Sequence, residues 1–97
     1  MSLQPHEPAP SSSAMKLLYF AWLRQRIGKA EETIELPREV QTVSALIDWL
    51  KTRGPNYAEA LKNPKLVRVA VNREYVPPGH ALKPGDEIGL FPPVTGG

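Results

Sequence analysis

The sequence predicts an α+β fold, in which a mixed sheet of roughly four to five strands carries one main helix packed on one face. Three observations lead to this prediction. Short apolar runs with strand patterning flank a single longer amphipathic segment at residues 43–53. The two most apolar runs, at 16–22 and 87–91, stand near opposite ends of the chain, which favours central strands that lie side by side. Glycine and proline residues separate the runs, as they do in turns.

The first element is the apolar run at 16–22, whose two faces both suit a central strand covered on both sides. One face packs against the protein's own helix, so the other requires a partner or forms an exposed apolar patch. A helical turn is expected at 23–28. Residues 31–36 alternate, with Ile34 and Leu36 facing inward, and predict a strand antiparallel to the first.

The main helix is predicted over 43–53. Thr42 is its N-cap, because a threonine hydroxyl accepts a hydrogen bond from an N–H of the first turn. Gly54 and Pro55 end it, and a short second helix is expected at 57–62. The apolar residues of the main helix recur at helical spacing and are interpreted as core rather than as a binding groove: they are Val43, Leu46, Ile47, Trp49 and Leu50.

Residues 66–72 predict a strand with three valines on one face and Arg68 and Ala70 on the other. Tyr75-Val76 predicts a further short strand.

Pro84-Gly85-Asp86 forms a tight turn that leads into the last strand, 87–91. In this strand Ile88 and Leu90 face one way, whereas Gly89 and Phe91 face the other. The order β-β-α-β-(β)-β, with the first and last strands as neighbours, is the β-grasp or ubiquitin-like fold.

Composition divides the chain into a tail and one domain. Residues 1–14 are rich in proline and serine and too poor in apolar side chains to offset their ordering entropy, so we expect a disordered tail. Residues 15–97 form a single β-grasp domain, which ends in a flexible tail at 92–97 that carries two glycines.

Charge and hydropathy exclude several function classes. The net charge is +2, and no lysine and arginine stripe with interleaved aromatics indicates nucleic-acid binding. No apolar run approaches the roughly 20 residues of a membrane span, so we expect no membrane contact and a cytoplasmic protein. The chain has no cysteine, which removes thiolate nucleophiles, persulfide carriers and thiolate zinc sites.

Other candidates for catalysis or metal binding are weak. Neither His6 nor His80 has a carboxylate at a spacing that would indicate a catalytic pair, so both are interpreted as surface histidines. Asp86 and Glu87 are adjacent at a turn, so their side chains point apart and turn chemistry explains them. We therefore expect no metal site and no cofactor bound by this chain.

The reactive group that remains is the terminal carboxylate of Gly97. Its pKa of about 3.5 makes it an anion at neutral pH and a poor acyl electrophile. A second protein would have to convert it with ATP into an acyl-adenylate before a nucleophile could attack. Pro92-Pro93 supplies a stiff spacer, and Gly96-Gly97 supplies an end thin enough to enter another protein's active site.

These residues resemble a known family. Phe-Pro-Pro-Val-Thr-Gly-Gly at 91–97, after Pro-Gly-Asp-Glu-Ile at 84–88, resembles the small subunits of molybdopterin synthase, the MoaD type. Leu-Tyr-Phe-Ala-Trp-Leu-Arg at 18–24 is similar to that family's first strand, and Val-Ala-Val-Asn at 69–72 to its third. The resemblance covers 15–97.

The resemblance implies a sulfur carrier that catalyses nothing alone. Gly97, next to Gly96, is adenylated by an E1-like enzyme, which is the chain's only contact with a nucleotide, and is then thiocarboxylated with sulfur from a donor protein. The tail inserts into the large catalytic subunit of a heterotetramer, where the sulfur passes to cyclic pyranopterin monophosphate. The residues that bind this partner by resemblance are an apolar trio and the rest of the tail: Phe20, Tyr75, Phe91, Pro92, Pro93, Val94 and Thr95.

Three alternatives stay open. A carrier of the same fold could deliver sulfur to thiazole, cysteine or tRNA synthesis. A ubiquitin-like modifier would form isopeptide bonds with lysines. A plain β-grasp binding module would use neither glycine.

Overall fold

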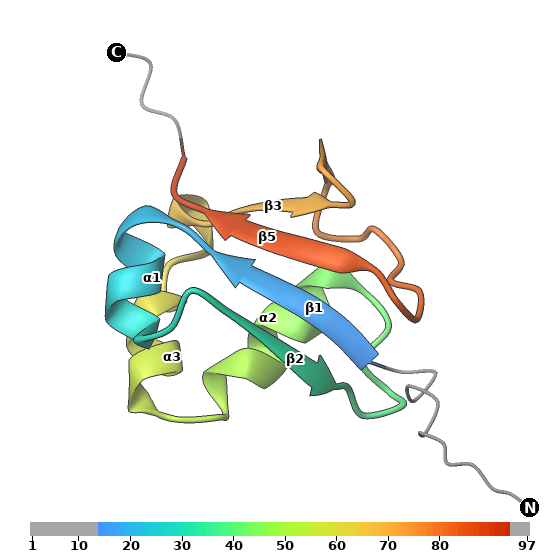
Figure 1. The fold of residues 1–97 in the computed structure, drawn as a ribbon, viewed down its shortest axis with the longest axis horizontal. Helices are drawn as coiled ribbons and strands as arrows, with labels where there is room; N and C mark the ends of the chain where they lie inside the picture. The colour runs from blue at the N-terminus through green and yellow to red at the C-terminus, as the bar shows by residue number, and fades with distance from the viewer. Residues whose placement is uncertain (1–13, 94–97) are drawn as a thin grey trace, which may run out of the picture.

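The computed structural model describes residues 14–93. A five-stranded sheet in the order β2-β1-β5-β3-β4 carries the helices on one face (Figure 1). The strands are β1 (Ala14–Tyr19), β2 (Glu31–Glu35), β3 (Arg68–Val71), β4 (Glu74–Tyr75) and β5 (Glu87–Phe91); the helices are α1 (Ala21–Ile27), α2 (Val43–Lys51), α3 (Pro55–Ala60) and the 3₁₀ helix η1 (Pro64–Leu66).

The first and last strands are neighbours at the centre of the sheet, as predicted. β1 and β5 run parallel, and Leu17 lies opposite Ile88 in their register. β2 pairs antiparallel with β1, and β3 pairs antiparallel with β5. This mixed topology is the β-grasp fold that the sequence predicted.

The core lies between the sheet and α2, which crosses behind β1 in Figure 1. Leu17, Leu46 and Leu50 are fully buried in it. The remaining predicted core residues of α2 follow the same face, with Val43 buried and Ile47 and Trp49 packed against the core while partly exposed. The Thr42 hydroxyl accepts a hydrogen bond from the Ala45 N–H at 3.1 Å, which confirms the N-cap.

The first strand is shorter than predicted. β1 ends at Tyr19 rather than at 22, because Ala21 has a φ of +55° and turns the chain away from the sheet into α1. The Phe20 N–H still donates to the Leu90 carbonyl at 3.1 Å, and the Phe20 carbonyl accepts from the Leu23 N–H at 3.2 Å. Ala21 and Trp22, which were predicted to be in the strand, therefore belong to α1, a helix of about two turns.

Other boundaries differ for local reasons. α3 begins at Pro55 instead of 57, because proline has the φ that a first helical residue needs. β3 begins at Arg68 instead of 66, because residues 64–66 are taken up by η1. β4 is Glu74–Tyr75, since Asn72 and Arg73 have φ values of +52° and +75° and form a two-residue hairpin turn.

Ala14, which the sequence prediction placed at the end of the tail, is the first residue of β1. The rest of the predicted tail, 1–13, lies outside the described residues. The helices lie on one face of the sheet only (Figure 1). Of the two outcomes predicted for the other face of the first strand, a partner or an exposed apolar patch, residues 14–93 show the second. Leu18 is half-buried and Phe20 is exposed, so an exposed apolar patch is what the strand presents.

Leu17→Ala tests the central position of β1. Leu17 is fully buried, so the substitution is expected to lower the free energy of unfolding by about 2–5 kcal/mol, measured by urea titration. Leu66→Ala is the matched control, because Leu66 is 44% exposed and surface substitutions usually change stability by less than about 0.5 kcal/mol. Equal losses in the two variants would contradict this view of the core.

A candidate docking face and the base of the C-terminal tail

The three aromatic residues proposed for docking lie together on the open face of the sheet. The rings of Phe20 and Phe91 stack with centroids 4.3 Å apart and planes 3° from parallel. Tyr75 meets Phe91 edge-on, with centroids 5.8 Å apart. Phe20 and Tyr75 are 38% and 65% exposed, respectively. The sequence prediction therefore named residues that the fold brings into one cluster.

Strand alternation puts them on this face. Tyr19 and Leu90 point into the core, so their neighbours Phe20 and Phe91 point to the opposite side. A row of small or apolar residues crosses the same face of the sheet. Its members pair in register on β1, β5, β3 and β4: Leu18, Gly89, Ala70 and Tyr75. The face thus has an apolar centre.

Charged side chains border this centre. Arg68 lies opposite Phe91 in the strand register, and its guanidinium sits 5.8 Å from the centroid of the Tyr75 ring. Arg73 and Glu87 approach to 3.9 Å; Arg73 is exposed and Glu87 half-buried, so this ion pair contributes little stability. An apolar centre with a polar border is the usual composition of a protein–protein interface.

The tail leaves the fold beside this face. Pro92 and Pro93 follow β5 directly and are half-buried. They line one side of a hollow of about 490 Å³, whose other walls include Trp22 and Ala60 of the helices and Leu66. Proline has no N–H, so the sheet cannot continue past Phe91. Val94, Thr95, Gly96 and Gly97 lie outside the described residues.

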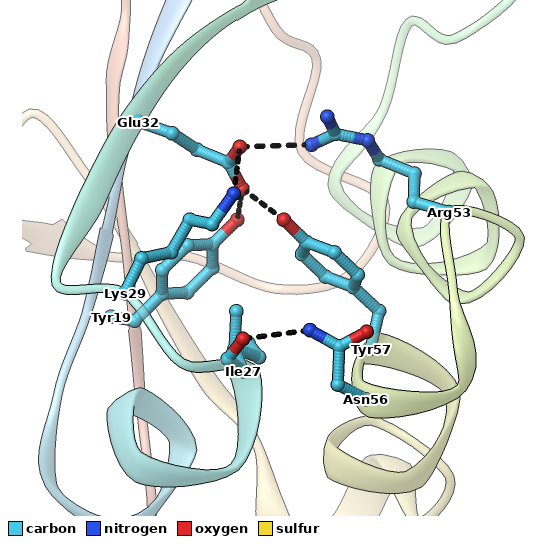
Figure 2. Close-up of polar contacts among 7 residues, drawn as sticks. All are labelled: Tyr19, Ile27, Lys29, Glu32, Arg53, Asn56 and Tyr57. Atoms are coloured by element: carbon cyan, nitrogen blue, oxygen red, sulfur yellow. Dashed lines mark hydrogen bonds and ion pairs between the residues drawn. The ribbon is translucent and has the colours of Figure 1, made fainter.

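A polar cluster behind the sheet was not predicted. Figure 2 shows the Glu32 carboxylate among side chains from four segments. The Tyr19 and Tyr57 hydroxyls each donate to its Oε2 at 2.7 Å, and Arg53 Nη1 donates to its Oε1 at 3.1 Å. Lys29 Nζ lies 3.4 Å from the same Oε1. A sequence signal existed, because Glu32 shares the inward side of an alternating strand with Ile34.

This cluster supports the docking face from behind. Tyr19 immediately precedes Phe20, so the bond from its hydroxyl to Glu32 holds the end of β1 where the chain turns. Next to the cluster, the Asn56 side chain donates to the Ile27 carbonyl at 2.7 Å and ties α3 to the last residue of α1 (Figure 2). These hydrogen bonds join α1, α3, β1 and β2 around Tyr19, the residue that precedes Phe20.

The cluster shifts the ionisation of its members. Partial burial opposes ionisation of Glu32, but the hydrogen bonds from Tyr19, Tyr57 and Arg53 outweigh it and lower the pKa of the Glu32 carboxyl. Burial, together with the hydrogen bond to Glu32, raises the pKa of the Tyr19 hydroxyl, which therefore remains a donor. Glu32 is thus held as an anion near neutral pH.

The remaining candidates have structural roles. The Asp86 carboxylate accepts from the Lys83 N–H at 2.8 Å and from the Asn72 side chain at 2.9 Å, which confirms turn chemistry. Among residues 14–93, no group of three or more histidine, aspartate or glutamate side chains is placed to hold a metal ion. Within the same range, no helix is both long and apolar enough to cross a bilayer. His6 lies outside the described residues.

Comparison with known proteins assigns the family. The sequence model of the ThiS family matches residues 17–97. The chain belongs to this family. It is 41% identical over 83 residues to a molybdopterin synthase sulfur carrier subunit of Haemophilus influenzae, covering 86% of this chain and 99% of that relative. The resemblance to molybdopterin synthase small subunits is thereby confirmed.

Solved structures agree with the fold. A putative molybdopterin converting factor subunit 1 from Pyrococcus furiosus superposes with a TM-score of 0.69 at 39% identity, covering 86% of this chain and all of that one. SAMP1 from Haloferax volcanii superposes with a TM-score of 0.67 at 29% identity, covering 87% and 99% of the two chains.

Glu32→Gln tests the polar cluster. Because the folded pKa of Glu32 is lowered, its stabilising effect is present above the unfolded pKa of about 4.3 and is lost as the pH falls through the folded value. The variant is expected to be less stable than the wild type by about 1–3 kcal/mol at pH 7, with the difference shrinking towards pH 2. Unfolding titrations across this range measure it.

The matched control is Glu35→Gln, on the exposed side of the same strand, where we expect little change. A stability difference for Glu32→Gln that stays constant from pH 7 to pH 2 would contradict the ionic role.

Proposed function

We propose that this chain is the sulfur-carrier subunit of molybdopterin synthase. The observation that carries the proposal is the continuity of three parts: the aromatic docking face, the Pro92-Pro93 spacer that starts at Phe91, and the terminal Gly96-Gly97. The 41% identity to a relative of that name supports it. In this role the chain carries the reactive group and presents it to other proteins.

The chemistry begins at the Gly97 carboxylate. An oxygen of this carboxylate attacks the α-phosphorus of ATP in an E1-like enzyme, which releases pyrophosphate and leaves an acyl-adenylate. Sulfur at the oxidation level of sulfide, supplied by a donor protein, then attacks the carbonyl carbon and displaces AMP, so the chain ends in a thiocarboxylate. The sulfur passes to cyclic pyranopterin monophosphate, and the carboxylate is restored with oxygen from water.

Partners supply what the chain lacks. The large catalytic subunit covers the docking face and receives the tail residues Val94 and Thr95 in a heterotetramer. The E1-like enzyme consumes the ATP, so this chain binds no cofactor of its own. We place these steps in the cytoplasm. Because the glycines present no side chain, the tail can enter both active sites in turn.

A second candidate is a protein modifier. SAMP1, which is 29% identical to this chain, belongs by its name to the small archaeal modifier proteins. A modifier would share the activation step but would end in an isopeptide bond to a lysine. Sulfur carriers for thiazole, cysteine or tRNA synthesis differ only in the acceptor, so co-purification with a large subunit that has synthase activity separates them.

Incubation with the cognate E1-like enzyme, ATP and a sulfur donor is expected to raise the intact mass of the full chain by about 16 Da, because sulfur replaces oxygen. Mass spectrometry reads the change directly. A variant that lacks Gly97 is the control and is expected to lose this conversion. No mass gain in a mixture that converts a known carrier would refute the carrier function, and a ladder of covalent adducts in denatured lysate would favour the modifier.

Phe91→Ala is expected to weaken binding to the large subunit about 30-fold, because loss of a central aromatic anchor typically costs about 2 kcal/mol or more. Titration calorimetry with the two purified subunits measures the affinity. Ser44→Ala, an exposed position on α2 behind the sheet, is expected to bind as the wild type does. Unchanged affinity in Phe91→Ala would remove the aromatic cluster from the interface.

A further inference from the structure

Gly89 occupies the centre of the open face for a steric reason. It lies on β5 between Leu18 of β1 and Ala70 of β3. A Cβ at this position would lie 2.8 Å from Cε1 of Phe91 and 3.4 Å from Cε2 of Phe20. The first distance is shorter than any contact between unstrained side chains, whereas the second is an ordinary van der Waals contact. The absence of a side chain at Gly89 is therefore what lets the Phe91 ring, on which Phe20 stacks, lie against the sheet.

The rings and the bare backbone together shape a hollow. It has a volume of about 210 Å³, with Gly89 and Ala70 as its floor and Leu18 and the stacked Phe20–Phe91 pair as its apolar walls. Arg73 and Glu87 stand at its remaining side. Gly89 thus determines two properties of this face, the depth of the hollow and the flat position of the aromatic wall.

We infer that this hollow receives one apolar side chain of the large subunit, and that Gly89 is the positioning residue that keeps the hollow open. The inference rests on the proposed function for the identity of the partner. The apolar floor and walls favour an aliphatic or aromatic side chain over a polar one, since a polar group buried there would lose its hydrogen bonds to water.

The positive charge of Arg68 indicates what lies next to the partner's apolar side chain. Arg68 stands beside Phe91 and Tyr75, and among the described residues it has no carboxylate within 4.0 Å. Arg68 is exposed, and its guanidinium offers five donors in a fixed plane to a carboxylate. The partner's apolar side chain is therefore expected to have an acidic residue next to it.

The position of the tail places the large subunit over this hollow. Four residues follow Pro93, and a fully extended chain of that length spans at most about 14 Å. The active site that takes up Gly97 must lie within this reach of Pro93, two residues beyond the end of β5. Phe91, which forms one wall of the hollow, is the last residue of that strand.

Gly89→Ala tests the inference with the full chain. The added methyl group meets the far edge of a ring that can swing about its own side-chain bonds, so the fold is kept and the Phe20–Phe91 stack is displaced. The expected result is at least a 10-fold rise in the Kd for the cognate large subunit. Gly79→Ala is the matched control, because a Cβ there meets nothing within 4 Å, and it is expected to bind as the wild type does.

A second variant keeps the test decisive if Gly89→Ala does not fold. Ala70→Leu fills the hollow from β3 and leaves Gly89 unchanged, and we expect a similar loss of affinity. Amide spectra of each variant report whether the fold is kept. Wild-type affinity in folded Gly89→Ala and Ala70→Leu, or an equal loss in Gly79→Ala, overturns the hollow alone. Failure of the wild-type chain to bind the large subunit overturns the proposed function together with it.

Discussion

The parallel pairing of β1 with β5 is the interaction on which the rest of the structure depends. It joins residues 16–19 to 87–90 at the centre of the sheet. Side chains on one side of this pair, such as Leu17 and Ile88, are fully buried beneath the helices. Side chains on the other side form the apolar centre of the open face. A single pairing therefore builds the core, the docking face and the point where the tail leaves.

Alternation along these strands separates stability from recognition. Tyr19 points inward to the Glu32 carboxylate, whereas Phe20, the next residue, points outward and stacks on Phe91. The inward cluster joins β1 and β2 to Tyr57 of α3 and to Arg53, so the backbone that carries Phe20 is held from behind. An aromatic ring on a rigid backbone loses little entropy on binding, which suits the proposed docking face.

The sequence predicted what is repeated or local, and it missed what arises from tertiary contact. Alternating apolar residues predicted the sheet, the helical stripe of Val43, Leu46 and Leu50 predicted α2, and the Gly89/Phe91 alternation correctly predicted an outward Phe91. The end of β1 could not be read from apolar character, because the turn depends on the positive φ of Ala21. The Glu32 cluster joins residues 13 and 25 positions apart, and no local pattern shows that these side chains meet.

Gly89 shows the same limit in another form. In the sequence, a glycine within a strand predicts only weak packing. The role of Gly89 becomes visible in the fold, where the rings of Phe91 and of Phe20, the residue after β1, lie above it. The reverse holds for the tail, whose proposed chemistry was inferred from the terminal carboxylate without knowledge of the fold. Because Gly96 and Gly97 offer no side chains, the tip itself gives an activating enzyme, a large subunit or a target lysine little to distinguish. If the chain acts as proposed, discrimination among partners comes chiefly from the folded face, and the shape beside Phe91 is where the differences between carriers of this fold should lie.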